Sequence, residues 1–79
     1  MNNAQVFETV RKVIADTFSF PEGEIDRDTV AEDVSGWDSL SHTILMIRLQ
    51  NALNIKIPEE VAAEASNVGD LADRLTQLV

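Results

Sequence analysis

The segment GWDSLSHTILMIRL, residues 36–49, decides the fold because a turn passes directly into a helix within it. Asp38 is a good N-cap, since its carboxylate can accept hydrogen bonds from the amides of a helical first turn. Apolar residues then recur at helical spacing, which predicts a helix from Ser39 to about Asn54. We expect one stripe of this helix to face the core: His42, Leu45, Met46, Leu49, Ala52 and Leu53. The Ser39 hydroxyl would then face solvent, where the first-turn amides and the helix dipole would favour an attached phosphate.

Before this segment, the sequence predicts one helix followed by a long loop. Apolar residues recur at helical spacing over residues 3–18, and Pro21 and Gly23 then end the pattern. Residues 20–37 form the loop, in which Thr29 and Glu32 have the spacing of a capping box and predict a single helical turn. Three apolar residues are expected to pin the loop to the core: Ile25, Val30 and Val34.

After the segment, the sequence predicts two shorter helices. Pro58 suits the first position of a helix, and the acidic residues behind it favour a short helix that ends near Ala65. Asn67 is expected to cap the last helix, with Asp70 reaching back to it. The apolar face of that helix would consist of Val68, Leu71, Leu75 and Leu78. We therefore predict an all-α fold, a small irregular four-helix bundle with a long loop between helices one and two and a short third helix, built by residues 1–79 as one domain.

Composition restricts the chemistry that this chain can perform. The chain has no cysteine, which removes disulfides, thiol nucleophiles and the common zinc frameworks, and its lone histidine argues against a metal site. The formal charge of -8 disfavours nucleic-acid binding. Neither a secretory signal nor an apolar stretch of about 20 residues is present. We expect a cytoplasmic monomer that binds neither nucleic acid nor membrane.

On these residues the chain resembles the acyl carrier protein family. The attachment motif of that family is Asp-Ser-Leu at the start of the second helix, which corresponds here to Asp38, Ser39 and Leu40. Residues 54–58, NIKIP, look like the link before the third helix of the family, and residues 67–71, NVGDL, look like the start of its last helix. The resemblance covers nearly the whole chain, and its strength comes from the position of the motif within this order of helices.

The resemblance implies a non-catalytic carrier. A phosphopantetheinyl transferase would move 4'-phosphopantetheine from coenzyme A onto Ser39, and the terminal thiol would carry an acyl or aminoacyl group as a thioester. Asp38 and Leu40 would be recognised by the transferase, and Asp38 would also help it to hold its metal ion. The further partners would be an acyl- or aminoacyl-loading enzyme and a downstream synthase or transferase. The bundle can shelter the cargo between visits.

One departure from many fatty-acid carriers concerns the predicted second helix, which has no acidic residue after Asp38. A second apolar stripe, Leu40, Ile44 and Ile47, lies away from the expected core stripe, with Arg48 at its edge. We interpret it as an exposed contact strip for partners, although burial of the helix would also explain it. This pattern fits a specialised acyl, polyketide or aminoacyl pathway better than housekeeping fatty-acid synthesis.

Two other functions are compatible with these residues. A small adaptor bundle would use Leu40, Ile44 and Ile47 to bind a partner helix without a prosthetic group. A hydrolase would use Ser39 as nucleophile and His42, three residues on, as base, with Asp38 completing a triad. The adjacency of Asp38 and Ser39 makes that relay hard to build.

Overall fold

The computed structural model describes residues 1–79 and consists of helices and loops, with no strand. The prediction of an all-α fold with a long loop and a short third helix is confirmed. No helix is both long enough and apolar enough to cross a membrane. The elements are α1 (Asn3–Phe18), a 3₁₀ turn (Glu22–Glu24), a second 3₁₀ turn (Ala31–Asp33), α2 (Ser39–Leu53), α3 (Glu59–Ala63) and α4 (Val68–Thr76).

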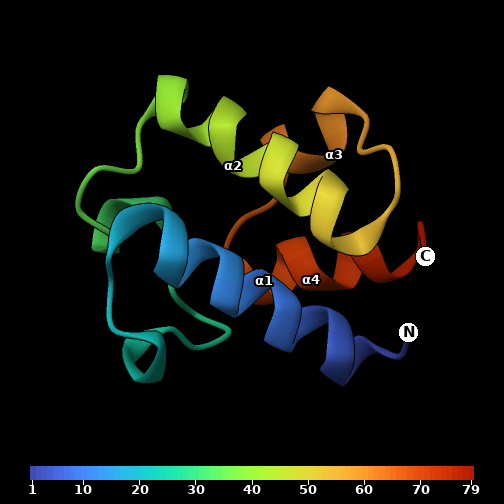
Figure 1. The fold of residues 1–79 in the computed structure, drawn as a ribbon, viewed down its shortest axis with the longest axis horizontal. Helices are drawn as coiled ribbons and strands as arrows, with labels where there is room; N and C mark the ends of the chain where they lie inside the picture. The colour runs from blue at the N-terminus through green and yellow to red at the C-terminus, as the bar shows by residue number, and fades with distance from the viewer.

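Helix α1 packs against both α2 and α4, and α3 packs on α4 (Figure 1). The two chain ends lie on the same side of the molecule (Figure 1). Asn3 Nδ2 links them by donating to Asp73 Oδ1 at 2.8 Å and to Thr76 Oγ1 at 3.1 Å. The start of α2 lies at the other end of the molecule, away from both termini.

The core is a single cluster to which every α-helix and the long loop contribute. Ile25 and Val34 anchor the loop in it as predicted, whereas Val30 is half-buried. Ala52 and Leu78, both expected in the core, are exposed, and Ala72 is buried in a position that the predicted stripe did not include. The thirteen core side chains are Val6, Val10, Ile14, Ile25, Val34, Leu45, Leu49, Leu53, Ala62, Val68, Leu71, Ala72 and Leu75.

The ends of the helices are set by short polar side chains. Asn2 Oδ1 accepts from the Gln5 amide and Gln5 Oε1 from the Asn2 amide, both at 2.9 Å, which forms a capping box at α1. Ser19 and Asn54 follow α1 and α2 in the left-handed conformation, with φ of 51° and 55°. Helix α2 therefore ends at Leu53, one residue before the predicted limit, because Asn54 turns the chain away.

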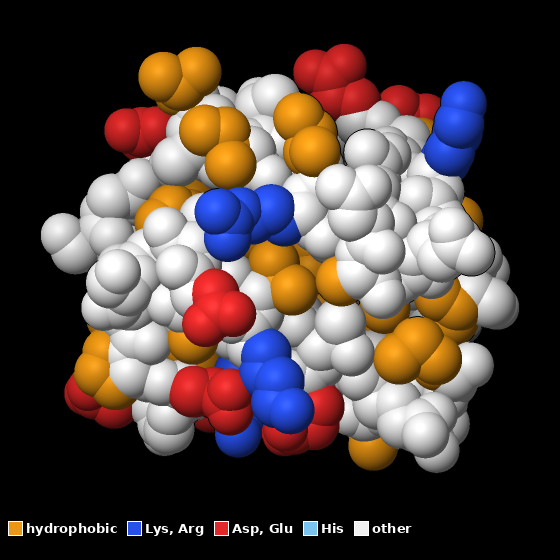
Figure 2. Space-filling model, viewed as in Figure 1, with side chains coloured by type: hydrophobic (Ala, Val, Ile, Leu, Met, Phe, Trp, Pro, Cys, Tyr) orange, Lys and Arg blue, Asp and Glu red, His pale blue; other side chains and the backbone are white.

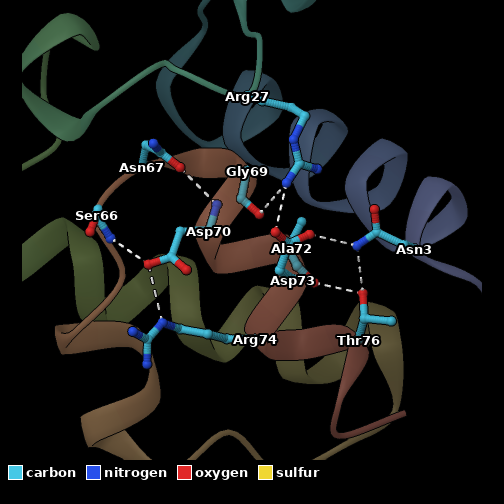
Figure 3. A network of polar contacts seen from close by, with 10 residues as sticks. All are labelled: Asn3, Arg27, Ser66, Asn67, Gly69, Asp70, Ala72, Asp73, Arg74 and Thr76. Atoms are coloured by element: carbon cyan, nitrogen blue, oxygen red, sulfur yellow. Dashed lines mark hydrogen bonds and ion pairs between the residues drawn. The ribbon is translucent and has the colours of Figure 1, made fainter.

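The long loop is fastened to the start of α4 by backbone hydrogen bonds. The Val68 amide donates to the Thr29 carbonyl at 2.8 Å, and the Gly69 amide donates to the Arg27 carbonyl at 2.9 Å. The Arg27 guanidinium also reaches the Gly69 carbonyl at 3.3 Å and Asp73 Oδ2 at 2.7 Å (Figure 3). These bonds satisfy two amides of α4 that a helix leaves without intrahelical partners. The loop is thus a fixed part of the fold.

The predicted Thr29–Glu32 capping box is wrong. Thr29 is buried, and its hydroxyl accepts a hydrogen bond from the Asp26 amide at 2.9 Å and donates one to Asp26 Oδ1 at 3.3 Å. Thr29 therefore stabilises the turn that precedes it. The second 3₁₀ turn begins one residue later, where the Val30 amide donates to Asp33 Oδ2 at 3.1 Å. The turn itself was predicted at about the right place.

Helix α3 begins and ends differently from the prediction. Pro58 is the residue before α3 rather than its first residue, with ψ of 140°, and the helix ends at Ala63 instead of near Ala65. At the start of α4, the Asn67 side chain accepts a hydrogen bond from the Asp70 amide at 2.7 Å as predicted, but the Asp70 side chain makes no hydrogen bond to Asn67. Its Oδ2 atom instead accepts from the Ser66 amide at 2.9 Å, one residue earlier.

The Asp70 carboxylate is expected to make stability depend on acid pH. Its hydrogen bond from the Ser66 amide, and then that from Arg74 Nε at 3.2 Å, hold the pKa of Asp70 below its usual value. Because the folded pKa is depressed, the contribution to stability is complete above the unfolded pKa of about 4 and is lost as pH falls through the folded pKa. Asp70→Asn should therefore unfold more readily than the parent at neutral pH, and the difference should fade below about pH 4. Chemical denaturation at several pH values would measure this, and a difference that persists in acid would contradict it.

Candidate functional site at the start of helix α2

Asp38 closes the N-terminus of α2 and is itself held by several bonds. Asp38 Oδ1 accepts from the Leu40 amide at 3.1 Å and from the Ser41 amide at 3.0 Å. Ser41 Oγ accepts from the Asp38 amide at 2.8 Å and donates to the Gly36 carbonyl at 2.6 Å. The bond from the Ser41 amide is the main reason that the pKa of Asp38 is lowered, so the side chain is a carboxylate at neutral pH.

Ser39 stands at the first position of α2, exposed, and its hydroxyl makes no hydrogen bond within the protein. The expectation that the first-turn amides favour a phosphate on this hydroxyl needs correction. The amides of Leu40 and Ser41 are already bound to the Asp38 carboxylate. The Ser39 oxygen is therefore accessible for covalent attachment, but these two amides are not free to bind a group attached there.

Two hollows border Ser39 and share Ser39, His42, Ala62 and Ala63 in their walls. The first, of about 360 Å³, opens toward the loop and α4 and is also lined by Trp37, Asp38 and Leu71. The second, of about 550 Å³, runs between α2 and α3 and is also lined by Met46, Ile47, Ile57 and Glu59. An extended group that leaves the Ser39 oxygen has two hollows beside it in which to lie.

Trp37 fixes the joint between the loop and α2. Its ring stacks on Phe18 with 5.6 Å between ring centroids, and on His42 with 6.1 Å. Trp37 Nε1 donates to His42 Nδ1 at 3.0 Å. Gly36, with φ of 92°, supplies the left-handed turn that brings Trp37 under the start of the helix. Through these contacts Trp37 covers the joint between the loop and the helix.

The geometry does not assemble a Ser-His-Asp triad. The Asp38 carboxylate is bound to the α2 backbone and to Ser41, and no bond joins it to His42. The Nδ1 atom of His42, which a triad would direct at the aspartate, accepts from Trp37 instead. The structure therefore brings Ser39 and His42 close on one helix but gives His42 no orienting acid.

The apolar strip formed by Leu40, Ile44 and Ile47 lies on the surface of α2, with the side chains 76%, 47% and 52% exposed. Arg48 is also exposed. In Figure 2, hydrophobic side chains gather over α2 with a Lys or Arg side chain beside them. Burial of α2, the other explanation of this stripe, does not hold. The strip starts one residue after Ser39.

Sequence reasoning missed two features of this site. Ser41 was given no role in the sequence analysis, yet its spacing of three residues from Asp38 is the signal of a capping box. The Trp37–His42 hydrogen bond has no sequence signature, since it depends on how the loop enters the helix.

Comparison with known proteins agrees with this geometry. Residues 8–75 match the family model described as a phosphopantetheine attachment site. An acyl carrier protein of Clostridium perfringens (strain SM101 / Type A) is 33% identical over 72 residues, which cover 91% of this chain and 95% of that protein. An acyl carrier protein of Guillardia theta is 29% identical over 79 residues, which cover 100% of this chain and 98% of that protein. No solved structure gives a significant match. The chain belongs to the acyl carrier protein family, whose prosthetic group is 4'-phosphopantetheine and whose members are carriers rather than catalysts.

Proposed function

We propose that Ser39 carries the 4'-phosphopantetheine arm and that this protein delivers acyl or aminoacyl groups to the enzymes of a specialised biosynthetic pathway. The observation that carries the attachment site is the free, exposed Ser39 hydroxyl at the start of α2, in the Asp-Ser-Leu sequence. When bound, the arm supplies a terminal thiol, which this cysteine-free chain lacks, and the cargo is held there as a thioester.

The residues around Ser39 fit such an arm. The hydroxyl has no competing hydrogen bond, and the hollows of about 360 and 550 Å³ beside it have walls of mixed apolar and polar character. Asp38 and Leu40 flank the hydroxyl on the exposed side, where a phosphopantetheinyl transferase can reach them. An ionised Asp38 suits the proposed contact with the metal ion of the transferase.

The proposal of a specialised pathway rests on the surface of α2. After Asp38 this helix contains no acidic residue, and its one charged side chain is Arg48. We propose that the strip of Leu40, Ile44 and Ile47 binds the loading enzyme through an apolar patch, with a carboxylate of that enzyme beside Arg48. A basic patch suited to an acidic helix would meet Arg48 with like charge, which costs binding free energy.

Intact mass spectrometry tests the attachment directly. The apo protein, incubated with coenzyme A, Mg²⁺ and a broad-specificity phosphopantetheinyl transferase, is expected to gain the mass of one phosphopantetheine, and peptide mapping should place it on Ser39. An adaptor bundle or a hydrolase would remain at its original mass. A stoichiometric adduct on another residue would overturn the site, and the lack of any adduct would overturn the function.

Ile44→Glu is expected to fold normally and to lose loading by the cognate enzyme. The side chain is 47% exposed, so a carboxylate there remains hydrated in the free protein. In the complex it would be buried without a partner, which costs about 1–3 kcal/mol and corresponds to a loss in loading rate of roughly 5- to 150-fold. The melting curve and the loading rate are the two measurements.

Ala4→Glu is the matched control, because it adds the same charge to an exposed position of α1, away from the strip. It should load within about twofold of the parent. If Ile44→Glu folds and loads as fast as Ala4→Glu, the strip is not the recognition surface, and the acidic loop or α3 takes its place.

A further inference from the structure

His42 presents one ring nitrogen to the space around Ser39. It lies one turn after Ser39 on α2, is half-buried, and lines both hollows that border the serine. Residues three apart on a helix are neighbours, and helical side chains tilt toward the N-terminus of their helix. The imidazole is therefore directed back toward the turn that contains Ser39.

The hydrogen bond with Trp37 fixes which nitrogen of His42 is protonated. An indole N–H can only donate, so the Nδ1 atom that receives it at 3.0 Å must hold its lone pair there. In the neutral ring the proton then resides on Nε2. Stacking on Trp37, which itself stacks on Phe18, restrains the plane of the ring. His42 thus carries an Nε2–H donor that makes no hydrogen bond within the protein.

The charges around Ser39 indicate what this donor could bind. The first-turn amides of Leu40 and Ser41 are bound to Asp38. No Lys or Arg lines either hollow, and the charged residues that do, Asp38 and Glu59, are acidic. A phosphodiester at Ser39 would therefore lie beside hollows whose charged lining is two carboxylates and no cation, and a neutral donor directed at it would offset part of that repulsion.

We propose that His42 is a positioning residue for the phosphopantetheine arm, its Nε2–H donating to a phosphodiester oxygen on Ser39 while Nδ1 accepts from Trp37. This inference rests on the proposed attachment at Ser39. It links the loop to the arm through one continuous chain of contacts, from Phe18 through Trp37 and His42 to the phosphate. The arm would then leave the serine in a restrained direction instead of swinging freely.

NMR spectroscopy of the apo and holo proteins tests the inference, after intact mass has established that the arm is on Ser39. In the parent, attachment should shift the His42 Nε2–H resonances by more than a linewidth while Nδ1 keeps the ¹⁵N shift of an acceptor nitrogen. The ³¹P resonance of holo His42→Phe, which keeps an aromatic ring but has no donor, should move from that of the parent. In holo His42→Gln the side-chain amide restores a donor, and the ³¹P resonance should return toward the parental value.

Val61→Ile is the matched control, since Val61 is half-buried on α3 but lines neither hollow, and its ³¹P resonance should stay at the parental position. His42 resonances that are identical in the apo and holo parent would overturn the inference, even if both His42 variants fail to fold. The absence of a mass adduct on Ser39 would instead overturn the attachment itself, so the two failures are distinguishable.

Discussion

Ser39→Ala is expected to abolish attachment of the arm completely and to leave the fold unchanged. The hydroxyl is the atom that would form the phosphodiester, and no other group at this position can replace it. It makes no hydrogen bond in the folded protein, and alanine is a favourable residue in the first turn of a helix. The melting temperature should therefore match that of the parent, while intact mass after transferase treatment should show no adduct.

Ser41→Ala is the control, because Ser41 is the nearest other hydroxyl and its surroundings are different. Its hydroxyl contacts the Gly36 carbonyl at 2.6 Å and the Asp38 amide at 2.8 Å, so its loss should cost about 1 kcal/mol of cap stability. It should still be modified on Ser39. An adduct on Ser39→Ala that disappears in Ser41→Ala would show that the attachment site had been assigned to the wrong serine.

Gly69→Ala is expected to destabilise the protein strongly. A Cβ at this position would lie 2.8 Å from Arg27 Cβ and 2.9 Å from the Arg27 carbonyl oxygen, and the second of these atoms is backbone. The loop would have to move, which would break the bonds from the Gly69 and Val68 amides. Overpacking and a lost hydrogen bond together cost about 2–4 kcal/mol, against a gain of at most about 1 kcal/mol from helix propensity. The melting temperature should fall by roughly 10 °C.

Gly23→Ala is the matched control for this experiment. A Cβ there would meet no atom within 4 Å, and its φ is not positive, so the melting temperature should stay the same or rise slightly. If Gly69→Ala has the same melting temperature as Gly23→Ala, the loop can move away from α4 at no cost. The close approach of Arg27 to Gly69 would then not contribute to stability.

The fold could be predicted from the sequence wherever local pattern decided it. Helix α1 was predicted with its limits, and the Asp38 and Asn67 caps of α2 and α4 were predicted with their roles, because capping residues and apolar periodicity are local signals. The predictions were wrong at positions whose burial or hydrogen-bond partner depends on tertiary contacts. Ala52 and Leu78 continue their stripes but are exposed, and the Thr29 hydroxyl binds Asp26 instead of pairing with Glu32.

The same division applies to the candidate site. Ser39 and its cap could be identified from the sequence, because both depend on order along the chain. The number of amides available to a phosphate was overestimated, since the cap that identifies the helix start also occupies those of Leu40 and Ser41. Gly69 could not be singled out as a close-packing position, because the atom that requires it belongs to Arg27, 42 residues earlier in the chain.

The stacked Trp37 has a practical consequence for following this protein in solution. The chain contains one tryptophan and no tyrosine, so nearly all of its absorbance and emission near 280–350 nm would come from a single indole, about two residues from the candidate attachment serine. That indole contacts the Phe18 ring on α1 and the His42 ring on α2. Its fluorescence therefore reports on the joint itself, without any label, whenever the arm is attached or another protein docks on α2.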